Sequence, residues 1–244
     1  MQSKFSFIII TACLLSFNLN AQETENQESG QNFTLSVDLV SNYVWRGLVF
    51  SDAPNIQPYL AFTTKNELIT LGAFGSYSLA DYYSEVDLFA SLNIGMFSFS
   101  IWDYFLMANQ PNNRFFDFKN ETTGHALEGV ITINGPESFP VMLTSGMFFY
   151  GADKNPEGEN YYSTYVELAY PFKWKSNNLS LFAGITPKEG LYASEFAMNN
   201  IGITNAREIK VNNAFSIPIK GSVIINPHRE NIHFVLTISL AAND

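Results

Sequence analysis

The sequence has few charged residues and, beyond residue 17, no long apolar run. Charged side chains make up 15% of its 244 residues, whereas hydrophobic residues make up 46% and aromatic residues 15%. A soluble domain with so few charges would need a deep core, and its elements would then carry continuous apolar runs. Lipid is the alternative environment for these apolar side chains.

Runs of basic residues are missing as well. The net charge is −10, and the 13 Lys and Arg residues are scattered along the chain. Proteins that bind nucleic acid neutralise phosphates with clustered Lys and Arg. We therefore expect no nucleic-acid partner.

The first 21 residues have the organisation of a secretory signal peptide. Lys4 supplies the positive start, and residues 5–17 form an apolar stretch that is shorter than the ~20 residues of a membrane-spanning helix. Cleavage after Ala21 would leave residues 22–31 as a polar N-terminus of the disordered type. A second interpretation is a lipoprotein anchored through Cys13, because residues 10–13 resemble a lipobox.

Residues that commonly carry catalysis or bind metals are scarce. Cys13 is the single cysteine, and three histidines occur at positions 125, 228 and 233. The sequence contains no G-x-S-x-G, H-E-x-x-H or Gly-rich phosphate loop. Residues 153–158 begin like a calcium loop, but Thr164 stands where the bidentate acid is required. We expect a protein that is not an enzyme and holds no cofactor and no metal.

From residue 32 onward, apolar and polar residues alternate with the period of two that is typical of half-buried strands. The last strand is the clearest, with Ile232, Phe234 and Leu236 on one face and His233 on the other. The pattern predicts 12 strands, an even number as in bacterial outer-membrane barrels. They span residues 33–46, 55–64, 67–78, 82–92, 95–106, 123–134, 139–150, 162–172, 178–186, 196–210, 213–226 and 231–240.

The connections alternate between tight turns and longer loops, which is how outer-membrane barrels separate a periplasmic end from an external end. We therefore predict an all-β fold, an antiparallel transmembrane β-barrel in one domain over residues 32–244 of an exported outer-membrane protein. A soluble barrel or sandwich is the alternative. Aromatic residues near strand ends favour lipid, because such residues form girdles at membrane interfaces. They are Tyr43, Trp45, Tyr82, Phe97, Tyr104, Tyr150, Tyr162 and Phe172.

Two residues disagree with this pattern. Asp103 falls on the apolar face of its strand, so it lies above the membrane or the register breaks there. Pro218 falls inside a strand, where it removes a hydrogen-bond donor from the ladder.

The inner face of the predicted barrel carries mostly acidic charge. Its candidates for setting selectivity are Asp38, Arg46, Glu85, Asp87, Glu128 and Glu167. In one interpretation these side chains line a passive channel for ions or small polar solutes and favour cations. In the other they pair with one another and fill a narrow barrel. Arg46 either borders a constriction or forms a structural salt bridge to a neighbouring strand.

The longest predicted loop, residues 107–122, suggests a different function. It combines Arg114 with Phe115, Phe116 and Phe118. A closed barrel could act through this loop in adhesion or envelope structure, with outer-membrane lipid and lipopolysaccharide as its surroundings. Alternatively, the aromatic residues fold into the barrel mouth as a plug.

Residues 41–47 (Ser-Asn-Tyr-Val-Trp-Arg-Gly), followed by Ser51-Asp52-Ala53-Pro54 and Gln57, resemble the opening motif of the TorF-like family of outer-membrane porins. Glu85 and Asp87 also fit the acidic strand of that family. The resemblance covers roughly residues 35–105 and implies a barrel and a pore without specifying a solute. Pro58 and Tyr59 depart from the family, in which many members have glycines after the glutamine.

Overall fold

The computed structural model describes residues 32–107, 114–210 and 216–241. The predicted signal peptide, Cys13 and the polar residues 22–31 lie outside the described residues, as do residues 108–113 of the longest loop. The compact unit begins at Asn32. Within the described ranges, no helix is long and apolar enough to cross a membrane.

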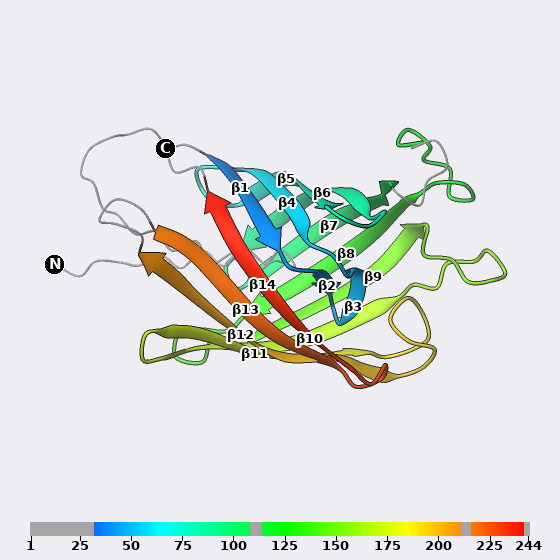
Figure 1. Cartoon of the computed structure of the whole chain (residues 1–244). Coiled ribbons are helices and arrows are strands. Elements are labelled where there is room, and N and C mark those ends of the chain that lie inside the picture. The colour runs from blue at the N-terminus through cyan, green and yellow to red at the C-terminus, as the bar shows by residue number, and fades with distance from the viewer. Residues whose placement is uncertain (1–31, 108–113, 211–215, 242–244) are drawn as a thin grey trace. The chain divides into compact units, whose positions relative to one another are not determined.

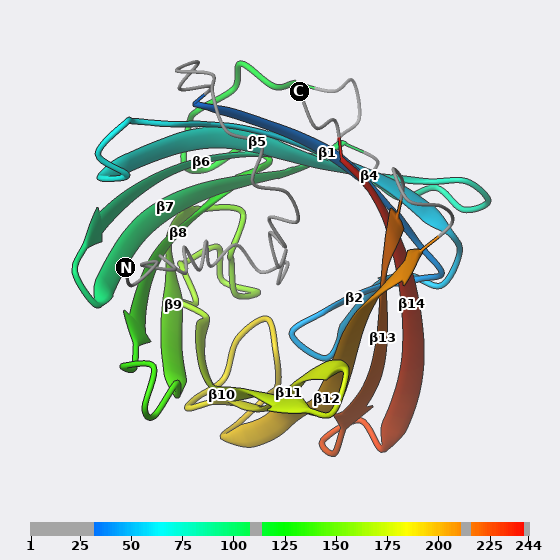
Figure 2. The same ribbon diagram turned by 90° about the vertical axis from the view of Figure 1, so that its left-hand side faces the viewer.

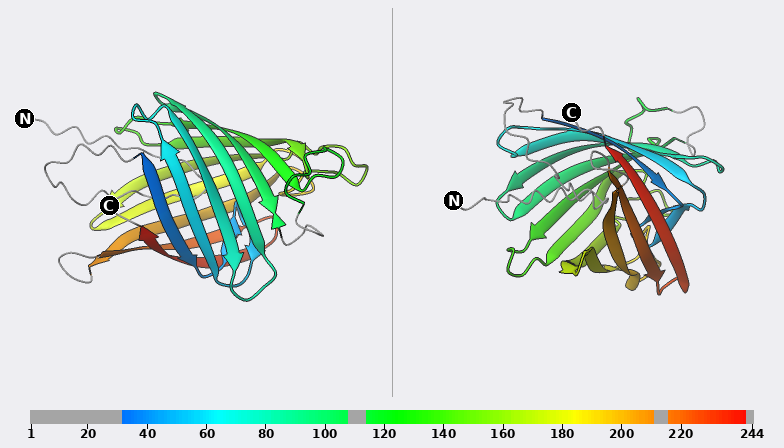
Figure 3. Two further views of the ribbon diagram at one scale, coloured as in Figure 1. Left: turned by 90° about the horizontal axis from the view of Figure 1, so that it is seen from above. Right: turned by 60° about the vertical axis from the view of Figure 1, so that its left-hand side comes forward.

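Over the described residues, twelve antiparallel strands close into a barrel, which confirms the predicted fold class and strand number (Figures 1 and 2). Each strand pairs with its neighbours, and β14 pairs with β1 to complete the ring. The strands run side by side at a tilt (Figure 3). They are β1 (Phe33–Val40), β4 (Asn55–Thr63), β5 (Ile69–Ser78), β6 (Ser84–Ile94), β7 (Phe97–Leu106), β8 (His125–Asn134), β9 (Met142–Gly151), β10 (Thr164–Trp174), β11 (Asn177–Thr186), β12 (Ala197–Lys210), β13 (Ser216–Asn226) and β14 (Asn231–Ala241).

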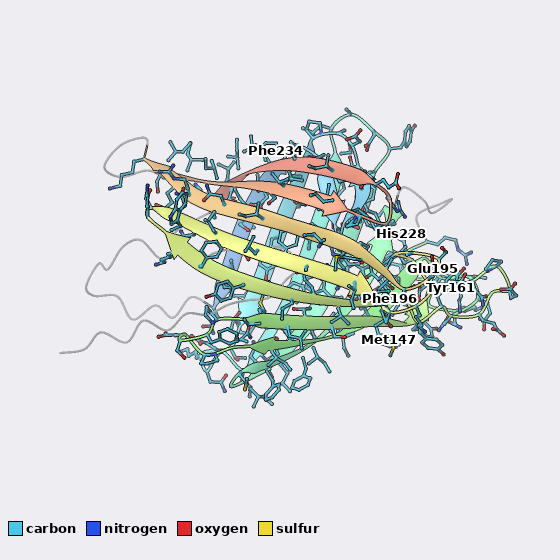
Figure 4. The ribbon with its side chains drawn as sticks, turned by 90° about the horizontal axis from the view of Figure 1, so that it is seen from below. Met147, Tyr161, Glu195, Phe196, His228 and Phe234 are labelled. Atoms are coloured by element: carbon cyan, nitrogen blue, oxygen red, sulfur yellow. The ribbon has the colours of Figure 1, made fainter. Side chains whose placement is uncertain are left out.

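The outer face of the barrel is apolar along its whole circumference. On β14, Phe234 and Leu236 are 65% and 41% exposed, whereas the alternating residues Val235 and Thr237 are buried on the inner side. Figure 4 shows Phe234 and Met147 on the outer surface of β14 and β9. The same pattern recurs around the ring, with exposed side chains at Leu35, Leu60, Leu71, Leu88, Ile101, Ile131, Leu143, Leu168, Leu181 and Ile203.

The two ends of the barrel differ as the connection lengths predicted. One end carries tight turns such as Gly95-Met96 and Lys175-Ser176, together with the first residue of β1 and the last of β14. The other end carries the long connections between β7 and β8, β9 and β10, and β11 and β12 (Figure 1). Tyr161, Glu195, Phe196 and His228 gather at this long-loop end (Figure 4).

The prediction that the first strand runs to Arg46 is wrong. Strand β1 ends at Val40, and the following residues form an inner hairpin of β2 (Tyr43–Trp45) and β3 (Leu48–Ser51) that pairs only with itself. It projects into the interior of the barrel (Figure 2). The chain reverses at Arg46 and Gly47, which both have positive φ angles of 50° and 76°. Because alternation continues through the hairpin, the sequence pattern alone did not reveal its departure from the wall.

The structure accounts for both exceptional residues. Asp103 points outward from β7 near the long-loop end, where it meets the His125 ring at 2.8 Å. Pro218 pairs with Glu208 of β12, but the ladder between β13 and β14 begins only at Ile219. The strand stagger thus leaves Pro218 beyond the last paired residue on the β14 side, which makes its missing N–H tolerable.

The assignment of outer and inner faces on β14 can be tested with arginine substitutions. Leu236→Arg places a cation on the exposed apolar face, which costs ~2–4 kcal/mol near the middle of a bilayer. Ser239→Arg is the matched control, because Ser239 lies on the inner face directly opposite Asp38. We expect heat-modifiable gel mobility to show failed assembly for the first variant and a folded barrel for the second. Equal assembly of the two would contradict the register of β14.

Candidate inner-hairpin site

The tip of the inner hairpin is attached to β12 and β13. The Asn199 side-chain amide donates to the Arg46 carbonyl at 2.8 Å, and that of Asn226 donates to the Gly47 carbonyl at 2.9 Å. Both asparagines are fully buried. The hairpin leaves the wall between β1 and β4. These bonds hold its tip inside the barrel against β13 and β12, which are two and three places from β1 in the ring.

Gly47 is required at this tip for steric reasons. Its φ of 76° lies in the left-handed region, and a Cβ atom there would lie 1.8 Å from the Asn199 carbonyl oxygen. Any side chain at position 47 would therefore push the tip away from β12.

Arg46 forms a bidentate ion pair with Glu128 of β8, four strands from β4. Its Nη1 lies 2.5 Å from Oε1, and its Nη2 lies 3.1 Å from Oε2. The two side chains are 4% and 0% exposed. The planar guanidinium matches the geometry of a carboxylate, which makes such a pair strong and specific. Gly146 leaves room for it, because a Cβ atom there would lie 2.2 Å from Glu128 Oε1.

Hydroxyl groups complete the polar surroundings of this pair. The Tyr104 hydroxyl donates to Glu128 Oε2 at 2.9 Å, and Arg46 Nη1 donates to the Tyr192 hydroxyl at 2.5 Å. Tyr192 comes from the connection between β11 and β12 and is fully buried. The charged groups are thus hydrogen-bonded as burial requires.

Aromatic rings surround the guanidinium. Its Cζ lies 4.3 Å from the centroid of the Trp45 ring and 4.8 Å from that of Tyr165. Cation–π attraction at these distances adds to the ion pair. The Trp45 ring also contacts Tyr104 and Tyr192, at 5.5 and 5.8 Å between centroids. Trp45 and Tyr104 therefore belong to the interior, and their prediction as parts of an outer aromatic girdle is wrong.

The side of the hairpin near β5 and β6 covers two carboxylates. Glu85 and Asp87 are 3% and 1% exposed on the inner face of β6. The Tyr83 hydroxyl donates to Glu85, and the Tyr83 ring packs against Tyr43 and Phe50 of the hairpin. Tyr43, another predicted girdle residue, also lies inside.

The other predicted charges of the interior, Glu167 and Asp38, lie on two further strands, β10 and β1. Glu167 of β10 accepts hydrogen bonds from Tyr165 and from the Asn200 side chain. Asp38 is buried on β1 opposite Gln57. Lys220 of β13, which sequence reasoning missed, lies opposite the inward-facing Thr237.

All six predicted interior residues therefore face inward, but they do not form one ring. Arg46 makes a salt bridge, as one interpretation predicted. Its partner, Glu128, lies on the distant strand β8, whereas a neighbouring strand was expected. The Arg46 pair, the Glu85 and Asp87 pair, and Asp38 occupy separate parts of the wall. Sequence reasoning missed Tyr192, Asn199 and Asn226, which are ordinary loop or strand residues by pattern. The adjacent Arg46-Gly47 was the available signal for a turn.

The long-loop candidates lie on the outside of the barrel. Phe115 and Phe118 pack against Phe105 and His125, which point outward from the ends of β7 and β8. Phe116 is 88% exposed, and Arg114 pairs with Asp117 at 2.7 Å. The interpretation of these aromatic residues as a plug in the barrel mouth is therefore wrong.

The incomplete calcium loop has a structural role. The Asp153 carboxylate accepts bonds from the Ser163 amide at 2.8 Å and the Ser163 hydroxyl at 2.6 Å, so it closes the connection between β9 and β10. Among the described residues, no group of three or more His, Cys, Asp and Glu side chains is arranged to hold a metal ion.

The comparison with solved structures finds similar chains at low sequence identity. A KdgM porin is 7% identical, with 86% of this chain and 99% of that chain covered and a TM-score of 0.49. OccK8 (OprE) of Pseudomonas aeruginosa is 12% identical, with 87% and 68% covered and a TM-score of 0.37. No protein-family model matches the chain, and no curated protein does. The resemblance to the TorF-like family therefore stays a prediction.

The steric requirement at the hairpin tip gives a direct test. We expect Gly47→Ala to lower the free energy of unfolding by ~1–3 kcal/mol more than Gly158→Ala, because overpacking adds to backbone strain. Gly158 is the matched control, since its φ of 84° is similar and nothing lies within 4 Å of its Cβ position. Urea unfolding of both variants in lipid vesicles measures the difference. Equal midpoints would show that the tip is not seated against Asn199.

Proposed function

We propose that this protein is a non-enzymatic outer-membrane channel for ions or small polar solutes, with the inner hairpin as its constriction. The observation that carries the proposal is the buried attachment of Arg46 to Glu128, which holds a polypeptide segment across the interior of a closed barrel. A hairpin held in this position would narrow a passage through the barrel.

Placement in a membrane follows from the contrast between the two faces. The outer face exposes large apolar side chains around the full ring, which would be unfavourable in water. The inner face carries polar and charged groups on the same strands. A closed barrel also satisfies its backbone hydrogen bonds without an exposed edge, which a membrane-spanning sheet requires. The predicted signal peptide agrees with export to the outer membrane.

The electrostatics favour cations. On the described strands of the inner wall, acidic side chains at positions 38, 85, 87, 128, 167 and 208 outnumber the basic side chains of Arg46, Lys173, Lys210 and Lys220. The long-loop end is acidic too, so a cation is attracted where it enters. Its acidic residues are Asp52, Asp81, Asp117, Glu121, Asp153, Glu157, Glu159, Glu189, Glu195 and Glu230, against Arg114, Lys119, Lys154, Lys188 and Arg229.

A closed barrel that acts through its outer loops is the second candidate. It is favoured by the burial of Trp45, Arg46, Glu128 and Tyr192, which form a tightly packed layer inside the barrel. If this layer fills the cross-section, solutes do not pass, and the external loops carry the function.

Single-channel recording in planar bilayers separates the two candidates. We expect wild type to conduct in discrete steps. Arg46→Ala with Glu128→Ala should conduct more strongly, because it removes two large side chains from the interior and the link between the hairpin and β8. Removing both partners avoids leaving one buried charge unpaired. Arg114→Ala with Asp117→Ala is the control, since it removes an ion pair of the same type from an external loop.

The outcomes have distinct meanings. No conductance from correctly folded wild-type protein would favour the closed barrel. Conductance that is equal in all three proteins would show that the hairpin does not form the constriction. Heat-modifiable mobility confirms that each variant is folded before it is recorded.

Cation preference is tested by reversal potentials under a potassium chloride gradient. We expect the preference to fall in Glu85→Gln with Asp87→Asn, since these carboxylates are ~7 Å apart along one strand and their fields add. Glu157→Gln with Glu159→Gln removes the same charge from an exposed loop and should change it less. High salt should weaken the preference, because the Debye length falls from ~10 Å at 0.1 M to ~3 Å at 1 M. Anion preference would contradict the proposal.

A further inference from the structure

The described residues 114–124 of the connection between β7 and β8 fold against the outside of the barrel wall. Its Phe115 ring lies 5.2 Å from the Phe105 ring, and its Phe118 ring stacks on His125 at 4.6 Å. Phe105 and His125 are paired residues at the ends of β7 and β8. Their direction is outward, because Tyr104 and Glu128 on the same strands bond to each other inside the barrel.

Three hydrogen bonds fasten this connection to the wall. His125 Nε2 donates to the Phe115 carbonyl at 2.6 Å, and the Tyr150 hydroxyl donates to the Phe118 carbonyl at 2.5 Å. The Gly151 amide donates to the Asn120 side chain at 3.1 Å. A carbonyl oxygen can only accept, so Nε2 carries a hydrogen. The other ring nitrogen of His125, Nδ1, faces the Asp103 carboxylate at 2.8 Å, which fixes the ring orientation.

This fastening leaves two aromatic side chains unburied. Phe116 is 88% exposed and Phe118 is 54% exposed, while His125, on which the Phe118 ring stacks, is 1% exposed. The wall below continues as exposed apolar side chains, with Ile101 on β7, Ile131 on β8 and Met147 on β9. The aromatic pair therefore extends the apolar outer face of the barrel toward its long-loop end.

We propose that residues 114–124 form a lipid anchor, in which Phe116 and Phe118 insert between lipids at the external interface and His125 positions them. The proposal rests on the placement of the barrel in a membrane. Lipid is the partner because the anchor is continuous with the lipid-facing wall and lies outside the channel mouth. Aromatic side chains prefer this boundary between headgroups and acyl chains. A soluble protein partner would need these rings to point away from the membrane.

Spin labelling of the exported protein in phosphatidylethanolamine and phosphatidylglycerol vesicles tests the anchor. Phe116→Cys carries the label, with Leu236→Cys as the lipid-facing reference and Glu157→Cys as the reference in water. We expect the label at 116 to collide with oxygen more than with a water-soluble nickel complex, as at 236. A label at 116 that behaves like 157 overturns the anchor. If the label at 236 is itself in water, the membrane placement fails instead.

The positioning role of His125 has its own readout. We expect His125→Ala to raise the mobility of the label at 116 and its collision rate with the nickel complex, while the label at 236 is unchanged. Tyr150→Phe removes the bond to the Phe118 carbonyl and should act in the same direction. It provides the test if the histidine variant does not assemble. An unchanged spectrum at 116 in both backgrounds would overturn the role of the fastening bonds.

Discussion

The ion pair between Arg46 and Glu128 holds the rest of the interior in place. A guanidinium and a carboxylate that are both withdrawn from water are stable together only when their remaining hydrogen-bonding groups are satisfied. Tyr104, Tyr192 and Trp45 are gathered around the pair for this reason. The hairpin, the wall of β8 and the connection before β12 are thereby fixed with respect to one another. Removal of one charge alone would leave the other buried and unpaired.

The barrel itself was predictable from the sequence, because a strand with one face in lipid and one inside must alternate with period two. On β14, the alternation alone placed Phe234 and Leu236 on the outer, apolar face. The same rule explains the failure at residues 43–51. A hairpin packed between the wall and the interior alternates as a wall strand does, so Tyr43 and Trp45 read as lipid-facing residues. The turn at Arg46 and Gly47 distinguishes the two. Its trace in the sequence is a single glycine, because the positive φ angles themselves belong to the folded structure.

The candidate site was predictable in composition and not in connectivity. Charged residues on the polar face of a strand point inward by alternation, which placed Glu85, Asp87 and Glu128 correctly. Which of them meets Arg46 depends on how far the hairpin reaches across the ring, a property that no local pattern contains. Asn199 and Asn226 show this limit of sequence-based prediction. Nothing in the sequence around them indicates that their side chains donate to carbonyl groups of the hairpin. Asp103 is the converse case, because its contact with His125 explains a charge on the outer face.

The two asparagine bonds at the hairpin tip also bear on how the chain can assemble. Asn226 and Gly47 are separated by 179 positions along the chain, and Asn199 and Arg46 by 153. Contacts between such distant segments are slow to form, because the loop entropy must be lost before they stabilise anything. The hairpin emerges among the first parts of the barrel, but its seat is made of strands that come close to the end. The tip can therefore dock only after β12 and β13 have paired in register. A chain truncated before these strands would lack the two asparagines that bind the tip.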